Sequence, residues 1–126
     1  MKNTMAKILL ADDSETLVSM LSEVLTNEGF EIIAVFSRQE LVRKLLDVVP
    51  DLILLDVRLG GDDGRKVCRD LKANSSYKDI PVILLSGSHE LLESYAEYNA
   101  DDFIEKPFEI EEILNKITKA LKNKEK

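Results

Sequence analysis

Five short apolar runs alternate along the chain with stretches whose apolar residues recur at helical spacing. The run from Leu52 to Leu55 contains no polar residue, which favours a strand buried on both of its faces. Strands that alternate with helices pair in parallel, and helices then cover both faces of the sheet. The sequence therefore predicts an α/β fold with a doubly wound parallel sheet, whose strands are expected at Lys7–Ala11, Glu31–Phe36, Leu52–Leu55, Val82–Leu85 and Asp102–Glu105.

The stretches between and after these runs predict five helices. Ser37 and Glu40 have the spacing of a capping box, in which the side chain of each residue accepts a hydrogen bond from the backbone N–H of the other. Ser14 or Asp13 is placed to cap the first helix, and Gly29 to end it. The apolar residues at helical spacing fall within Leu17–Leu25, Leu41–Val49, Val67–Leu71, Leu91–Ala96 and Ile110–Leu121.

Size and composition limit what the chain can be. Its 126 residues suffice for one hydrophobic core, so we expect a single domain over residues 1–126, with a core at about 7–121 and a lysine-rich tail at 122–126. The formal net charge of -7 disfavours direct binding to nucleic acid, which needs a basic face. No apolar run approaches the roughly 20 residues that span a membrane, and no signal sequence is recognisable. The single cysteine excludes an internal disulfide, so a cytoplasmic protein is expected.

Polar side chains follow four of the five predicted strands. Asp12 and Asp13 follow the first strand, Asp56 the third, Ser86 the fourth and Lys106 the fifth. In the strand order 2-1-3-4-5 of a flavodoxin-like sheet these four strands are neighbours, and the second strand lies at the edge. Since ligands bind at the carboxyl ends of such strands, the five residues are expected to converge on one pocket.

Three carboxylates in one pocket repel one another unless a cation neutralises them. Mg²⁺ suits such a site, because it is a small, hard ion that takes oxygen ligands and often retains water or binds phosphate. Lys106 could pair with a phosphoryl oxygen, and Ser86 could bond another. Each residue alone has a simpler explanation, as a helix cap, a loop cap or a surface lysine. Their joint placement is what favours a functional site.

As a set, these motifs resemble the receiver domain of two-component response regulators. The residues that carry the resemblance are Asp12-Asp13, Asp56, Ser86-Gly87 and Lys106-Pro107-Phe108, within a match from Lys7 to about Leu121. The resemblance implies that Asp56 accepts a phosphoryl group from a phosphohistidine on a sensor histidine kinase or a histidine phosphotransfer protein. A receiver of this kind is not an enzyme, beyond catalysing its own phosphorylation and dephosphorylation with Mg²⁺.

The resemblance also implies a role for each neighbouring group. Asp13, Asp56 and the backbone carbonyl of Arg58 would bind Mg²⁺ directly, whereas Asp12 would act through a metal-bound water. Lys106 would neutralise the charge of the phosphoryl group. The remaining phosphoryl contacts would come from Ser86, Gly87 and Val57.

A conformational switch is implied as well. In the family the hydroxyl at Ser86 moves toward the phosphoryl group, and an aromatic side chain, here Phe103, turns inward behind it. Phe103 stands where tyrosine is common, so this switch should be less sharply two-state. The altered surface would comprise the helix from His89 to Glu97, the fifth strand and the last helix, and would bind a downstream effector. The Lys106-Pro107 peptide bond is cis in the family.

The chain departs from the family pattern in three places. Leu59-Gly60 stands where Met-Pro is usual, and Gly61-Asp62-Asp63 follows, so this loop should be more mobile. Arg58 could lie over the phosphoryl group and, together with Ser88, tune the loss of phosphate. No effector domain follows Lys126, so a stand-alone receiver or an excised piece of a longer protein is expected.

Other interpretations remain open at this point. A phosphorelay shuttle, which passes phosphate on to a second histidine, would have the same site residues. A pseudo-receiver would bind a partner without ever being phosphorylated. A phosphatase of the haloacid-dehalogenase type needs Asp-x-Asp, and a flavodoxin needs a Ser/Thr-rich loop, neither of which follows the first strand. His89 is interpreted as a surface residue that starts a helix. A monomer or weak dimer is expected.

Overall fold

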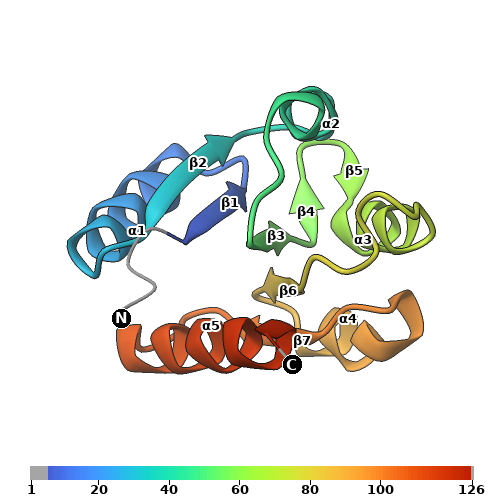
Figure 1. The fold of residues 1–126 in the computed structure, drawn as a ribbon. Coiled ribbons are helices and arrows are strands. Elements are labelled where there is room, and N and C mark those ends of the chain that lie inside the picture. The colour runs from blue at the N-terminus through green and yellow to red at the C-terminus, as the bar shows by residue number, and fades with distance from the viewer. Residues whose placement is uncertain (1–5, 126) are drawn as a thin grey trace.

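A parallel sheet of five strands forms the centre of the molecule (Figure 1). The computed structural model describes residues 6–125. The strand order is β2-β1-β3-β6-β7, which is 2-1-3-4-5 when the five strands are numbered along the chain, so the predicted flavodoxin-like (βα)5 topology is confirmed. The strands are β1 (Lys7–Ala11), β2 (Glu31–Val35), β3 (Leu52–Asp56), β6 (Val82–Ser86) and β7 (Asp102–Glu105).

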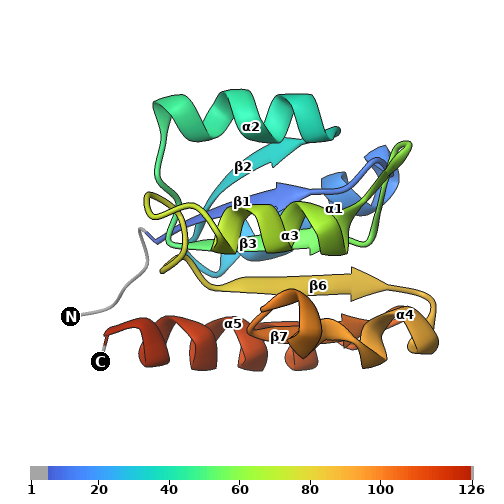
Figure 2. The same ribbon diagram turned by 90° about the vertical axis from the view of Figure 1, so that its right-hand side faces the viewer.

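Helices cover both faces of this sheet (Figures 1 and 2). On one face α1 (Glu15–Asn27) and α5 (Ile110–Glu125) pack over a buried cluster that includes Ile8, Leu54 and Ile83. On the other face α2 (Arg38–Asp47), α3 (Gly64–Lys72) and α4 (His89–Glu93) pack over a cluster that includes Leu9, Ile53 and Leu84. Successive strand residues thus enter opposite cores, and every residue of β3 and β6 is buried.

Local contacts explain where the first two helices begin and end. Ser14, rather than Asp13, caps α1, because its hydroxyl accepts a hydrogen bond from the backbone N–H of Leu17 at 3.3 Å. Gly29 follows that helix with φ of 100°, a conformation that favours glycine. The Ser37 hydroxyl accepts from Glu40 N–H at 3.1 Å, while the Glu40 carboxylate accepts from the N–H of Phe36 at 2.7 Å. In a capping box the Glu40 carboxylate would accept from the N–H of the cap residue, Ser37, but here it accepts from the residue before the cap, Phe36.

Several element boundaries differ from the sequence prediction. The bond to Glu40 takes the N–H of Phe36 out of the sheet, so β2 ends at Val35. Helix α4 has only five residues and is followed by a 3-10 turn, η1 (Tyr95–Tyr98), which ends at Asn99 with φ of 66°. The segment expected as a fourth helix is therefore two short elements.

The loop after β3 contains a small hairpin that the sequence did not predict. Its strands are β4 (Arg58–Leu59) and β5 (Asp62–Asp63), which pair antiparallel. Gly60 supplies the positive φ of 63° at the turn.

The last helix extends further than the sequence predicts. Helix α5 continues through Glu125, so residues 122–125 of the expected tail are helical, while Lys126 lies outside the described residues.

Among residues 6–125, no helix combines the length and the apolar character needed to cross a membrane.

Candidate functional site

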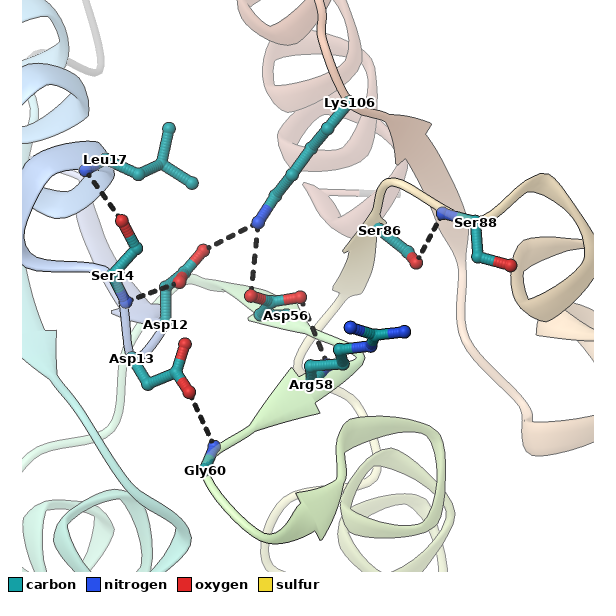
Figure 3. A network of polar contacts seen from close by, with 10 residues as sticks. All are labelled: Asp12, Asp13, Ser14, Leu17, Asp56, Arg58, Gly60, Ser86, Ser88 and Lys106. Atoms are coloured by element: carbon teal, nitrogen blue, oxygen red, sulfur yellow. Dashed lines mark hydrogen bonds and ion pairs between the residues drawn. The ribbon is translucent and has the colours of Figure 1, made fainter.

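The carboxyl ends of β1, β3, β6 and β7 bring their polar residues together around one open pocket of about 600 Å³ (Figure 3). The five residues expected to converge, Asp12, Asp13, Asp56, Ser86 and Lys106, all line it. The remaining lining residues come from the segments that directly follow three of these strands: Ser14, Arg58, Gly60, Gly87 and Ser88.

The acidic residues form a cluster that could hold a metal ion. One carboxylate oxygen from each of Asp12, Asp13 and Asp56 lies within 4.8 Å of the other two. Asp12 is fully buried and Asp56 is 6% exposed, whereas Asp13 faces solvent. A cluster of hard oxygen donors with one open side fits Mg²⁺, which keeps several waters when it binds to proteins.

Lys106 is the cation that balances two of these acids. Its Nζ lies 3.1 Å from Asp12 Oδ2 and 3.1 Å from Asp56 Oδ2 (Figure 3). The backbone N–H of Lys106 donates to the carbonyl of Ser86 at 2.8 Å, which fixes the end of β7 against β6. The Lys106-Pro107 peptide bond is cis, as the resemblance implied.

Burial and charge shift the ionisation of the central pair. The pKa of Asp56 is raised from 3.8 to about 6, mainly by burial and then by the charge of Asp12, while Lys106 and the N–H of Arg58 oppose part of the increase. Burial by itself would lower the pKa of Lys106, but the charges of Asp56 and Asp12 and the hydrogen bonds to them outweigh it, so that pKa is raised. At neutral pH Lys106 is a cation beside a carboxylate that is mostly ionised.

The hairpin that follows Asp56 is joined to the acidic cluster by backbone N–H groups. Arg58 N–H donates to Asp56 Oδ1 at 3.1 Å, and Gly60 N–H donates to Asp13 Oδ2 at 3.1 Å (Figure 3). The Arg58 side chain is exposed at the rim of the pocket. The β4–β5 hairpin thus connects the loops after β1 and β3.

The structure does not present the backbone N–H of Val57 to the pocket. This N–H donates to the carbonyl of Leu85 at 2.9 Å, because Val57 extends the parallel ladder between β3 and β6. Val57 is buried in the core on the α2–α3 face and does not line the pocket. The backbone N–H of Arg58 lies beside the Asp56 carboxylate instead.

Sequence reasoning missed the importance of Gly64. Its N–H donates to the carbonyl of Val57 at 2.6 Å, and a Cβ at this position would lie 2.1 Å from the carbonyl oxygen of Asp56. Only glycine lets α3 begin so close to the backbone of the phospho-acceptor candidate. A glycine at the expected start of a helix, a few residues after a buried strand, was the available signal.

Ser86, at the end of β6, and Ser88, two residues later, are linked to each other and to α4. Ser86 Oγ accepts a hydrogen bond from Ser88 N–H at 3.0 Å (Figure 3). The hydroxyl of Ser88 in turn caps α4 by accepting from the N–H of Leu91 at 3.3 Å. Ser88 is therefore both a pocket residue and the N-cap of the neighbouring helix.

Phe103 lies outside the pocket. Its half-buried ring packs against the ring of Tyr95, with the two centroids 4.9 Å apart. Lys116 of α5 also approaches this ring, with its Nζ 4.7 Å from the Phe103 centroid. His89 begins α4 and is exposed, with ring nitrogens 3.2 Å from Glu105 and 3.4 Å from Glu93. The interpretation of His89 as a surface residue at a helix start is correct.

Sequence comparison identifies relatives over almost the whole chain. A family model described as the response regulator receiver domain matches residues 8–118. The chain is 32% identical over 121 residues to the DNA-binding response regulator MtrA of Mycolicibacterium smegmatis, an alignment that covers 94% of this chain and 52% of MtrA. It is 37% identical over 118 residues to the regulatory protein VirG of Agrobacterium tumefaciens, covering 91% and 43% of the two. The chain thus spans about half the length of the curated relatives it matches.

Solved structures show the same architecture. The receiver domain of a signal transduction histidine kinase from Syntrophus aciditrophicus matches with a TM-score of 0.86 and 33% identity, over 94% of this chain and 91% of that one. The receiver domain of NtrX from Brucella abortus matches with a TM-score of 0.84 and 29% identity, over 91% and 98%. The chain therefore belongs to the response regulator receiver domain family, whose members are switches in two-component, phosphorylation-controlled signalling.

Proposed function

We propose that Asp56 accepts a phosphoryl group from the phosphohistidine of a sensor histidine kinase or a histidine phosphotransfer protein. One observation carries this proposal: Lys106 Nζ is placed 3.1 Å from both Asp12 and Asp56, in a pocket that also holds Asp13. Asp56 Oδ attacks phosphorus, the bond from phosphorus to the imidazole nitrogen breaks, and an aspartyl phosphate forms. This is phosphoryl transfer by positioning and electrostatics.

Asp12, Asp13 and Asp56 would hold Mg²⁺, together with the backbone carbonyl of Arg58. The bound ion supplies positive charge that offsets repulsion between the carboxylates and the incoming phosphoryl oxygens. Lys106 adds a second positive charge on the side of Asp12 and Asp56. Without a metal ion, burial raises the pKa of Asp56, so the ionised carboxylate is disfavoured. A bound cation would stabilise the ionised form, which supports a metal site here.

The phosphoryl oxygens would be received by Ser86, by the N–H of Gly87 and by the N–H of Arg58. The last of these replaces Val57, whose N–H bonds Leu85 within the sheet. The hydroxyl of Ser86 can donate to a phosphoryl oxygen while it accepts from Ser88, so the bond to Ser88 connects an event at the pocket with the cap of α4. The surface formed by α4, β7 and α5 would then change and bind a downstream effector, with Phe103 as the switch aromatic.

Two further hypotheses concern the lifetime of the phosphorylated state. The exposed Arg58 side chain at the pocket rim would cover the phosphoryl group and slow its hydrolysis, and Ser88 would act beside it. Arg58→Ala should therefore change the rate of dephosphorylation several-fold, measured by loss of the phosphoryl mass with time. An unchanged rate in Arg58→Ala contradicts this role.

We also propose that residues 1–126 form one cytoplasmic receiver domain, as a monomer or weak dimer, that does not itself bind nucleic acid. The net charge of -7 supports the last point, since binding to phosphates needs a basic face. Whether the phosphoryl group controls an effector or moves on to a second histidine depends on partners. Mixing the phosphorylated protein with a histidine phosphotransfer protein and following the label distinguishes the two.

Incubation with acetyl phosphate and Mg²⁺ tests the proposed acceptor. The intact protein should gain the mass of one phosphoryl group, and Asp56→Asn should not. Asp62→Asn is the matched control, because Asp62 is an exposed acid of the β4–β5 hairpin that follows Asp56, and it pairs only loosely with Arg38, at 4.0 Å. A wild-type protein that gains no mass supports a pseudo-receiver, and a gain that persists in Asp56→Asn places the acceptor elsewhere.

A further inference from the structure

Exposed apolar side chains gather at one helix of this protein. Among the described residues, the large hydrophobic side chains with high exposure are Met20 on α1 and four residues in or next to α2: Phe36, Val42, Leu46 and Val49. Leu46 is 76% exposed and Val49 is 64% exposed. Single exposed apolar residues are ordinary, but a group on one helix indicates an interaction surface.

The fold does not need these residues to be apolar. Helix α2 packs on the sheet through Leu41 and Leu45, which are 0% and 3% exposed. Val42 and Leu46 each come one residue later, about 100° further around the helix, and their side chains leave the core. A surface helix usually carries polar residues at such positions. Their apolar character is therefore unexplained by packing within the described residues.

Val42 and Leu46 lie one helical turn apart and line a shallow groove. The other lining residues of this α2 groove are Arg38, Gln39 and Arg43. None of the five lines the pocket around Asp56, and none belongs to α4, β7 or α5. Figures 1 and 2 show α2 on the outside of the molecule beside the edge strand β2. The groove is thus separate from both the phosphorylation site and the proposed output surface.

The charge at the groove selects the kind of partner. The Arg38 guanidinium is engaged within the chain, 3.5 Å from Asp70 and 4.0 Å from Asp62. Arg43 is exposed, and its guanidinium makes no hydrogen bond or ion pair with any residue that the structure describes. A free guanidinium next to an apolar groove favours a carboxylate on an otherwise apolar ligand, because guanidinium binds carboxylate with two parallel hydrogen bonds.

A second copy of the same chain fits poorly. In a symmetric pair the groove would face its own lining residues, which include two arginines and no carboxylate to pair with Arg43. The groove is also small, so it matches a weak, transient contact rather than a stable dimer. An amphipathic helix of another protein needs only a few anchors in such a groove.

We propose that the α2 groove docks an acidic amphipathic helix of a partner protein. Two apolar residues of that helix, spaced i and i+4, would contact Val42 and Leu46, and a carboxylate beside them would pair with Arg43. The docking site shares no lining residue with the pocket around Asp56. It would hold the receiver to a partner in either phosphorylation state.

A synthetic helical peptide with leucines on one face and glutamates beside them is the probe. Its binding is measured by fluorescence anisotropy of a labelled peptide titrated with the full chain. We expect saturable binding that weakens about tenfold or more in Leu46→Glu and in Arg43→Glu, equivalent to 1.4 kcal/mol. Met20→Glu is the matched control, because Met20 is an exposed apolar residue of a different helix, and it should bind as wild type does.

Circular dichroism and phosphorylation from acetyl phosphate should be unchanged in all three variants, which shows that the fold and the Asp56 site are intact. Absence of peptide binding, or equal binding by wild type and Leu46→Glu, overturns the proposal. So does a peptide with lysine in place of glutamate that binds equally well. A dimer in sedimentation that Leu46→Glu abolishes would assign the groove to a second copy, and binding to phosphatidylglycerol vesicles without peptide binding would assign it to a membrane.

Discussion

Replacing Asp56 by asparagine should make the metal-free protein more stable at neutral pH. Burial and, to a smaller extent, the charge of Asp12 raise the pKa of Asp56 from 3.8 to about 6, a net value that includes the opposing effect of Lys106. The folded state therefore binds this proton more tightly than the unfolded chain does, and ionisation of Asp56 destabilises the fold. At 1.36 kcal/mol for each pKa unit, the cost is about 3 kcal/mol at a pH well above 6. Asparagine has the same shape without the charge and removes this cost.

The pH dependence gives the prediction its sign. Above about pH 6, Asp56 is ionised in both states and the whole difference between wild type and Asp56→Asn should be present. The difference should shrink as the pH falls through 6 and vanish below 3.8, where both states of the wild type are protonated. Urea unfolding of both proteins in a chelating buffer, at neutral pH and near pH 4, measures it. Asp62→Asn, at an exposed position, should stay within about 0.5 kcal/mol of wild type.

Magnesium should reduce the difference in stability between Asp56→Asn and wild type, because it stabilises the wild type more. An ion that binds the folded wild type at 100 times its Kd adds about 2.7 kcal/mol to stability, and Asp56→Asn lacks one of the ligands. If Asp56→Asn is instead less stable than wild type at neutral pH, the ion pair with Lys106 outweighs burial and the reasoning fails. A difference that does not change with pH refutes it as well.

Three further substitutions test the surroundings of the site. Gly64→Ala places a Cβ 2.1 Å from the Asp56 carbonyl oxygen, so thermal unfolding should show a loss of about 2 kcal/mol or more and phosphorylation should slow. Lys106→Met removes the cation beside Asp56, so mass spectrometry should show phosphorylation at least about tenfold slower. Arg65→Ala removes the hydrogen bonds from the Arg65 guanidinium to Asp63 and Ser94, and urea unfolding should show a loss of about 1 to 2 kcal/mol.

The strand order and the central residues were predictable from the sequence for a common physical reason. Parallel strands end at the same edge of the sheet, so the residues after them are brought together by topology rather than by the details of packing. Asp12, Asp56 and Lys106 needed only the order of the strands to be placed in one pocket. The helix cap at Ser37 was predictable because its bond to Glu40 spans only three residues.

The features that were not predicted depend on contacts between distant segments. The β4–β5 hairpin is held partly by the bond from Gly60 N–H to Asp13, 47 residues away in sequence. The sequence led us to expect the N–H of Val57 in the pocket, but in the structure it bonds to Leu85. The register of β3 with β6 decides which N–H groups face the neighbouring strand. The division of the fourth helix likewise reflects its packing against α3, where Arg65 reaches Ser94 at 3.2 Å.

These contacts place the reacting groups and the proposed readout on elements of very different stability. Asp56 and Ser86 are the last residues of β3 and β6, whose residues are all buried. Helix α4 has five residues, too few to be stable without tertiary contacts, and it depends on the Ser88 cap at one end and on the bond between Ser94 and Arg65 near the other. Because Ser88 is also bonded to Ser86, a change at the pocket acts directly on the cap of this marginal helix. We therefore propose that the sheet stays fixed while α4, a short helix held by few contacts at its ends, rearranges in response.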